Sequence, residues 1–191
     1  MVTAGAWARA LRPVAWPSVL EPSFDNDVDH FRGATRPGVA LCVLGDYECP
    51  YTRMAVAVVS GLERELVGEL RWVFRHFPLV EKHPHALDAA RAAEAAALQN
   101  AFWPMHDRLL GHQHELENPA LRRHAEALGL DIERFDADRM GEVTLRRVAR
   151  DLAGGERVGI SGTPSFFVDG ERWDGDYRQG ELEAALRERL G

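Results

Sequence analysis

Cysteine is scarce in this sequence, whose 191 residues contain only Cys42 and Cys49. Two cysteines cannot form the framework of several disulfides that stabilises small secreted proteins. Lysine is scarcer still, with Lys82 as the single example. The sequence contains 23 lysine and arginine residues and 30 aspartate and glutamate residues. The net charge of −7 argues against a nucleic-acid partner, because such binding depends largely on neutralising phosphates.

Long apolar runs are also missing, since no stretch approaches the roughly 20 consecutive apolar residues that cross a bilayer. The start of the chain is mildly apolar, but Arg9, Arg12, Pro13 and Pro17 interrupt it, so it lacks the hydrophobic region of a signal peptide. We therefore expect no membrane contact and a cytoplasmic location. Residues 1–27 show no sustained periodicity and are expected to form a loosely ordered leader.

The first half of the chain reads as a strand, a helix and a second strand. Residues 39–44 form a continuous apolar run next to glycines, which is typical of a strand buried on both faces. A helix begins after Cys49, with Pro50 in its first turn, where the missing N–H is harmless. Residues 70–77 alternate and are rich in aromatic and β-branched side chains, which predicts a strand and completes a βαβ unit.

The second half reads as a block of helices followed by two strands and a helix. Asp169 and Gly170 form a hairpin turn between strands at 165–168 and 171–173. This order predicts an α/β thioredoxin-like fold (βαβ … ββα, central mixed sheet) with an inserted helical subdomain. The expected domain spans 28–190 and consists of a βαβ part (28–83), the helical insertion (84–158) and a ββα part (159–190).

A cysteine at the start of a helix can be a reactive nucleophile. The unpaired N–H groups there and the positive end of the helix dipole favour the thiolate of Cys49. An inert, buried cysteine is the alternative. Thr163 and Pro164, directly before a strand, favour the reactive interpretation. In a thioredoxin fold such a proline is cis and faces the active thiol, and the residue before it offers backbone groups to an extended substrate.

Four stretches carry a resemblance to a known family. They are DHFRGATRPGVALCVLGDYECPYT (29–52), LRWVFRHFPLVEKHPHA (70–86), FWPMHDRLLGHQHEL (102–116) and GISGTPSFFVDGERWDG (159–175). Together they resemble DsbA-like thioredoxin-fold proteins, in particular the bacterial branch that is also found fused to sodium/proton antiporters. The resemblance is collinear over about residues 28–190 and implies a thiol–disulfide oxidoreductase ancestry.

Two departures from the family pattern stand out. The family has Cys-Pro-Tyr-Cys at the helix start, whereas this chain has Cys49, Pro50, Tyr51 and Thr52. The family usually carries an acidic residue six positions before the first cysteine, and this chain has Val43 there. In the dithiol mechanism the second cysteine releases the product and a buried carboxylate can accept its proton. We interpret the two losses together as a loss of dithiol chemistry.

The favoured function is therefore a thiol–disulfide oxidoreductase with one active cysteine, which acts through a mixed disulfide that an external thiol clears. No resident cofactor is expected, and glutathione is the candidate co-substrate. The expected partners are protein or small-molecule thiols and disulfides. A glutathione-dependent transferase or isomerase and a redox-inactive peptide-binding module remain as alternatives. The expected catalytic residues are Cys49, Thr52 and Pro164, and the expected substrate-binding residues are Pro50, Tyr51 and Thr163.

Several other residues have simpler expected roles. Cys42 lies seven residues before Cys49 in an extended segment, too far for the Cα separation of about 4.4–6.8 Å that a disulfide needs, so we expect a core residue. The Thr52 hydroxyl is expected to donate to the sulfur or to bond a backbone carbonyl. The pairs His83–His85 and His112–His114, with His106, have a spacing that metal sites use, but the resembling stretches imply no metal and we expect none. The remaining residues of interest are expected to be core groups: His76, Phe102, Trp103 and Met105.

Overall fold

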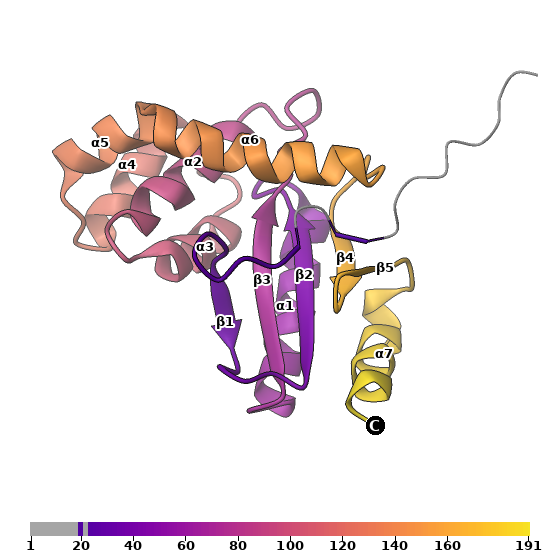
Figure 1. Cartoon of the computed structure of the whole chain (residues 1–191). Helices are drawn as coiled ribbons and strands as arrows, with labels where there is room; N and C mark the ends of the chain where they lie inside the picture. The colour runs from indigo at the N-terminus through magenta and orange to yellow at the C-terminus, as the bar shows by residue number, and fades with distance from the viewer. Residues whose placement is uncertain (1–18, 21–22) are drawn as a thin grey trace, which may run out of the picture.

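A five-stranded mixed sheet forms the centre of the computed structural model, which describes residues 19–20 and 23–191 (Figure 1). Its order is β1-β3-β2-β4-β5; β2 and β3 are parallel, and the other neighbouring strands are antiparallel. The predicted thioredoxin-like α/β fold is thereby confirmed. The strands are β1 (Phe31–Gly33), β2 (Val39–Gly45), β3 (Leu70–His76), β4 (Ser165–Val168) and β5 (Glu171–Trp173).

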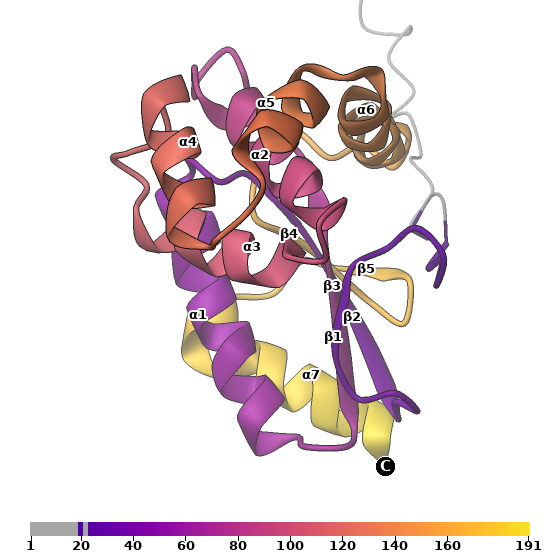
Figure 2. The same cartoon turned by 90° about the vertical axis from the view of Figure 1, so that its left-hand side faces the viewer.

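The helices follow the predicted order, and five of them lie between β3 and β4, where the insertion was expected. Helices α1 and α7 lie on one face of the sheet, whereas α6 lies towards the other (Figure 2). Within the described residues, no helix combines the length and the apolar character needed to cross a bilayer. The helices are α1 (Pro50–Glu65), α2 (Ala86–Ala97), α3 (Phe102–Gly111), α4 (Asn118–Ala127), α5 (Ile132–Met140), α6 (Glu142–Arg157), the short 3₁₀ helix η1 (Tyr177–Gln179) and α7 (Glu181–Leu190).

Strand β2 is buried on both faces, as its continuous apolar sequence predicts. Successive side chains of a strand point to opposite faces. Leu41 and Val43 therefore belong to the core beneath α1 and α7, while Cys42 and Leu44 belong to a second core on the opposite face. All four side chains are fully buried.

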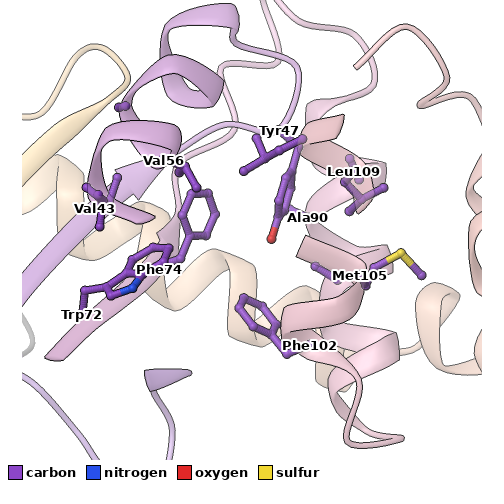
Figure 3. Packing of buried hydrophobic residues seen from close by; sticks show 14 of the residues in the cluster. Val43, Tyr47, Val56, Trp72, Phe74, Ala90, Phe102, Met105 and Leu109 are labelled. Atoms are coloured by element: carbon purple, nitrogen blue, oxygen red, sulfur yellow. The ribbon is translucent and has the colours of Figure 1, made fainter. Parts of the chain in front are cut away.

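The first core runs without a break from the sheet into the helical insertion (Figure 3). Trp72 and Phe74 of β3 belong to the same cluster of buried residues as Ala90 of α2 and Phe102 and Met105 of α3. The alanine-rich sequence of α2 suits this position, because small side chains let the surrounding helices approach closely. The insertion is thus an extension of the sheet's own core.

Part of the predicted leader packs on the second core. Leu20 is buried, its backbone N–H donates to the carbonyl oxygen of Gly170 at 2.6 Å, and its neighbour Val19 forms a bridge with Glu171. Phe24 also packs against this core. The described end of the leader is therefore attached to the sheet, and residues 1–18 and 21–22 lie outside the described part of the chain.

Helix α6 approaches the sheet closely at Gly155. A Cβ atom added there would lie 2.6 Å from the Phe77 ring and 2.7 Å from Leu44 Cδ2. Gly155→Ala should therefore lower the free energy of unfolding by about 1–3 kcal/mol through overpacking. Gly61→Ala on α1, where an added Cβ meets nothing within 4 Å, should raise it by about 0.5–1 kcal/mol. Urea denaturation of both variants checks the two signs, and a stabilised Gly155→Ala would contradict the close packing.

Candidate active site

Cys49 lies at the start of α1, where the chain turns from β2 into the helix. The backbone N–H of Cys49 donates to the carbonyl oxygen of Asp46 at 3.1 Å, which closes this turn. Pro50 occupies the first turn of the helix, where its missing N–H removes no hydrogen bond. No side-chain cap is found at this end of α1 among the described residues. The first-turn N–H groups and the helix dipole therefore remain to stabilise a negative charge next to Cys49.

The sulfur of Cys49 contacts the backbone of the residue before Pro164. Cys49 Sγ donates a hydrogen bond to the carbonyl oxygen of Thr163 at 3.4 Å, and the Thr163–Pro164 peptide bond is cis, as expected for this fold. Cys49 is only 3% exposed, but it lines a pocket of about 260 Å³. The other residues that line this pocket are Pro50, Tyr51, Leu79, Lys82, His83, Gly162 and Thr163.

Thr52 contacts the active-site turn and not the sulfur. Its side chain is fully buried, and its hydroxyl oxygen accepts a hydrogen bond from the backbone N–H of Asp46 at 3.2 Å. The expected bond from Thr52 to the sulfur or to a carbonyl is therefore replaced by one that fixes the turn before Cys49. Tyr51 is 56% exposed at the pocket, and its carbonyl oxygen accepts a hydrogen bond from the hydroxyl of Tyr177 at 3.3 Å.

A buried carboxylate that the sequence analysis missed organises this turn. Asp46 Oδ1 accepts a hydrogen bond from the backbone N–H of Glu48 at 2.8 Å. Asp46 Oδ2 accepts one from the backbone N–H of Leu79 at 2.8 Å and bonds His83 Nδ1 at 2.8 Å. Asp46 thereby ties the turn before Cys49 to the loop after β3. The position of Asp46, directly after a buried strand and three residues before the cysteine, was the available signal.

The helical insertion also holds the active-site turn. Gln113, between α3 and α4, donates from Nε2 to the carbonyl oxygens of Tyr47 at 2.7 Å and of Cys49 at 2.9 Å. The hydroxyl of Tyr47 forms a hydrogen bond with His106 Nδ1 at 3.0 Å. Burial lowers the pKa of His106 well below its ordinary value, so this imidazole is neutral. Nothing in the local sequence marks Gln113, because its role depends on contacts between distant segments.

Cys42 and Val43 are core residues. Both cysteines are free, and Cys42 is fully buried in the second core, which confirms its expected role. Burial raises the pKa of the Cys42 thiol well above its ordinary value, so this thiol stays protonated and unreactive in the folded chain. Val43 lies in the first core, paired across the sheet with Phe74 and Phe166.

Three of the histidines that were weighed as metal ligands, His83, His106 and His112, form hydrogen bonds within the protein. His83 bonds Asp46, and His112 Nδ1 forms a hydrogen bond with the carbonyl oxygen of Arg108 at 2.8 Å. Among the described residues, no three His, Cys, Asp or Glu side chains are grouped so that they could hold a metal ion. His76 is fully buried and bonds Glu94 at 2.7 Å, which confirms it as a core group. The expected packing roles are also confirmed for Phe102, Trp103 and Met105.

Curated relatives of the chain are named as sodium/proton antiporters. It is 46% identical over 183 residues to Na(+)/H(+) antiporter NhaA 1 of Salinispora arenicola (strain CNS-205). The aligned region covers 94% of this chain and 28% of that protein. It is 42% identical over 170 residues to Na(+)/H(+) antiporter NhaA of Herminiimonas arsenicoxydans, covering 89% of this chain and 27% of that protein. The chain therefore spans little more than a quarter of the length of these relatives.

Solved structures and a family model agree on the fold. A thioredoxin-like oxidoreductase from Silicibacter pomeroyi DSS-3 superposes with a TM-score of 0.77 at 30% identity, covering 87% of this chain and 95% of that one. Oxidised BdbD from Bacillus subtilis superposes with a TM-score of 0.79 at 17% identity, covering 91% of this chain and 99% of that one. At this identity the similarity is evidence for the fold only. Residues 42–187 match the DSBA-like thioredoxin domain. Since these residues make up most of the sequence, the chain belongs to the DSBA-like thioredoxin domain family.

Proposed function

We propose that this chain is a thiol–disulfide oxidoreductase that works through Cys49 alone. The main support is the placement of one sulfur at the uncapped start of α1, 3.4 Å from the carbonyl oxygen of Thr163 and at the wall of a pocket. The position where the dithiol relatives carry a second cysteine holds the buried hydroxyl of Thr52, which cannot resolve a mixed disulfide.

The proposed reaction is an exchange between one disulfide and one thiol. The Cys49 thiolate attacks a disulfide R–S–S–R′, forms a mixed disulfide with R and releases R′ as a thiolate. A thiol R″SH, such as glutathione, then attacks the sulfur of R, which frees Cys49 and yields R–S–S–R″. The net change is R–S–S–R′ + R″SH → R–S–S–R″ + R′SH, so no further oxidant or reductant is needed.

The surroundings of the pocket favour protein thiols as well as small ones. Tyr51 and Met54 are exposed apolar side chains on the first turns of α1, close in sequence to Cys49. The backbone of Thr163 can pair with an extended substrate segment, as in strand addition. A mechanism that depends on reduced glutathione requires a reducing compartment, which agrees with the expected cytoplasmic location.

Treatment of the folded chain with oxidised glutathione tests the proposal. Mass spectrometry should find one glutathione on Cys49 in the wild type and in Cys42→Ala, because Cys42 is fully buried with a raised pKa. Cys49→Ser should remain unmodified. A wild type that takes up no glutathione, or a Cys49→Ser variant that takes it up equally, contradicts the proposal.

An activity assay separates this proposal from the alternatives. Cys49→Ser should reduce glutathione-dependent disulfide exchange to the uncatalysed rate, whereas Cys42→Ala should leave it close to that of the wild type. An unchanged rate in Cys49→Ser would rule out the single-cysteine mechanism. Glutathione binding that survives Cys49→Ser would instead support a transferase, and an inert Cys49 would support a binding module.

A further inference from the structure

A histidine shares the pocket with Cys49. The side chain of His83 is 20% exposed and lines the same pocket as the sulfur. Its Nδ1 bonds the carboxylate of Asp46 at 2.8 Å, and that carboxylate is fully buried. Because an ionised carboxylate only accepts hydrogen bonds, Nδ1 carries the proton, and Nε2 of the neutral ring is left with a lone pair.

The partner of this histidine is itself held in place. Asp46 also accepts hydrogen bonds from the backbone N–H groups of Glu48 and Leu79, each at 2.8 Å. These bonds fix the carboxylate between the turn before Cys49 and the loop that carries His83. The orientation of the imidazole relative to the active-site turn is therefore set by the fold.

We propose that His83 accepts the proton of the incoming thiol in the second half of the exchange, with Asp46 as its positioning residue. The inference rests on the proposed function. His83 Nε2 takes the proton of R″SH, and the resulting thiolate attacks the R sulfur of the mixed disulfide. The bond between that sulfur and Cys49 breaks, and its electron pair leaves with Cys49 Sγ as a thiolate. The imidazolium then returns its proton to solvent.

The chemistry of the second step explains why a base is useful here. A free thiol has a pKa of about 8.5, so most of it is protonated and non-nucleophilic at pH 7. A neutral imidazole accepts protons near this pH and is the commonest general base in enzymes. Val43 occupies the position where the resembled family usually carries an acidic residue. His83 supplies a base from the side of the pocket instead.

A two-step experiment with His83→Asn tests this role. The asparagine amide can replace Nδ1–H as the donor to Asp46, but it offers no base. The Cys49–glutathione adduct is formed first with oxidised glutathione, and its discharge by reduced glutathione is then followed by mass spectrometry. We expect adduct formation as in the wild type and discharge at pH 7 slowed about tenfold or more. The matched control is His85→Asn, two residues further on and outside the pocket, which should discharge at the wild-type rate.

Two further measurements separate a proton-transfer role from a structural one. Added imidazole should restore part of the discharge rate of His83→Asn. The gap between variant and wild type should narrow above about pH 8.5, because the attacking thiol then ionises by itself. Asp46, which bonds His83, and the titratable residues that share its pocket, Cys49, Tyr51 and Lys82, are all retained in the variant.

Results that contradict the role of His83 can be distinguished from results that contradict the proposed function. Equal discharge rates in His83→Asn and wild type overturn the role of His83 and leave the proposed function standing. A slower discharge that imidazole does not restore and that pH does not change overturns it too, in favour of a structural role. A wild-type chain that forms no adduct at Cys49 overturns the proposed function and this inference together.

Discussion

Replacing Asp29 by alanine should lower the free energy of unfolding by about 3–5 kcal/mol, because it removes a buried carboxylate that pairs with the buried Arg75 and the partly buried Arg147 and Arg150. Asp29 is fully buried at its side chain and accepts hydrogen bonds from Arg75 Nε at 3.0 Å and Nη2 at 2.7 Å. Arg147 and Arg150 also donate to this carboxylate, at 3.4 Å and 3.3 Å. These contacts join the segment before β1 to β3 and to α6.

Urea denaturation at pH 7 measures this loss, and the matched control is Asp27→Ala. Asp27 is exposed two residues earlier, and its removal should change the free energy of unfolding by no more than about 0.5 kcal/mol. A loss of less than about 1 kcal/mol in Asp29→Ala would show that the arginines find other compensation, and the buried cluster would then not be a main source of stability.

The pH dependence of Asp29→Ala gives a second check. Burial acts to raise the pKa of Asp29, but the hydrogen bonds and charge of Arg75 outweigh it and hold the pKa below its ordinary value. A depressed pKa in the folded state contributes stability above the pKa of the unfolded chain, about 3.9 for aspartate. That contribution disappears as the pH falls through the folded pKa. The difference between wild type and variant should be constant near neutral pH and shrink below about pH 4.

Local sequence patterns were sufficient to predict the strands, turns and helices whose sequence is long or distinctive. The apolar run of β2, the turn at Asp169 and Gly170 and the amphipathic end of the chain each determine their structure within a few neighbouring residues. Strand β1 was missed because three residues show no periodicity. Its pairing depends on distant contacts, such as the Arg71 guanidinium 3.8 Å from the Phe31 ring and the Trp103 N–H that donates to the Phe31 carbonyl.

The residues of the candidate site also divide into those that local sequence predicts and those that depend on distant contacts. Cys49 and the Thr163–Pro164 peptide could be named from the sequence because a strand-to-helix turn and a proline before a strand are local signals. The contacts that support them could not be predicted, because the bond from Asp46 to His83 spans 37 residues and the bond from Gln113 to Tyr47 spans 66. The direction of a side chain such as Thr52 likewise depends on which backbone group the fold brings near it.

Thr52→Cys should give the chain an intramolecular route for releasing glutathione from Cys49. Cys49 is the N-cap of α1 and position 52 lies three residues later, a spacing that can bring the two side chains within disulfide range. In the wild type the adduct waits for an external thiol. In the variant the new thiol can attack the Cys49 sulfur, release glutathione and leave an intramolecular disulfide. Mass spectrometry of the preformed adduct, without added thiol, measures this release.

The matched control for this variant is Thr144→Cys. Thr144 is also buried, but it lies at the start of α6 in the insertion, where its hydroxyl donates to the carbonyl oxygens of α5 and of Gly141. A thiol placed there adds a third buried cysteine at a site away from Cys49, so the adduct should persist. Glutathione release from both variants would point to exchange between molecules.

The release in Thr52→Cys should nevertheless be slow at pH 7, since position 52 is fully buried. The Thr52 methyl group and the Phe74 ring both lie within 3 Å of the place where a Cβ on Gly45 would be, so the new thiol would be packed in the core. Burial raises the pKa of a thiol above about 8.5, and Val43 supplies no carboxylate to accept its proton. Glutathione release and insulin reduction should therefore be weak at pH 7 and rise steeply towards pH 9. Full activity at pH 7 from this single substitution would show that Val43 is incidental and that the second thiol alone distinguishes this chain from its dithiol relatives.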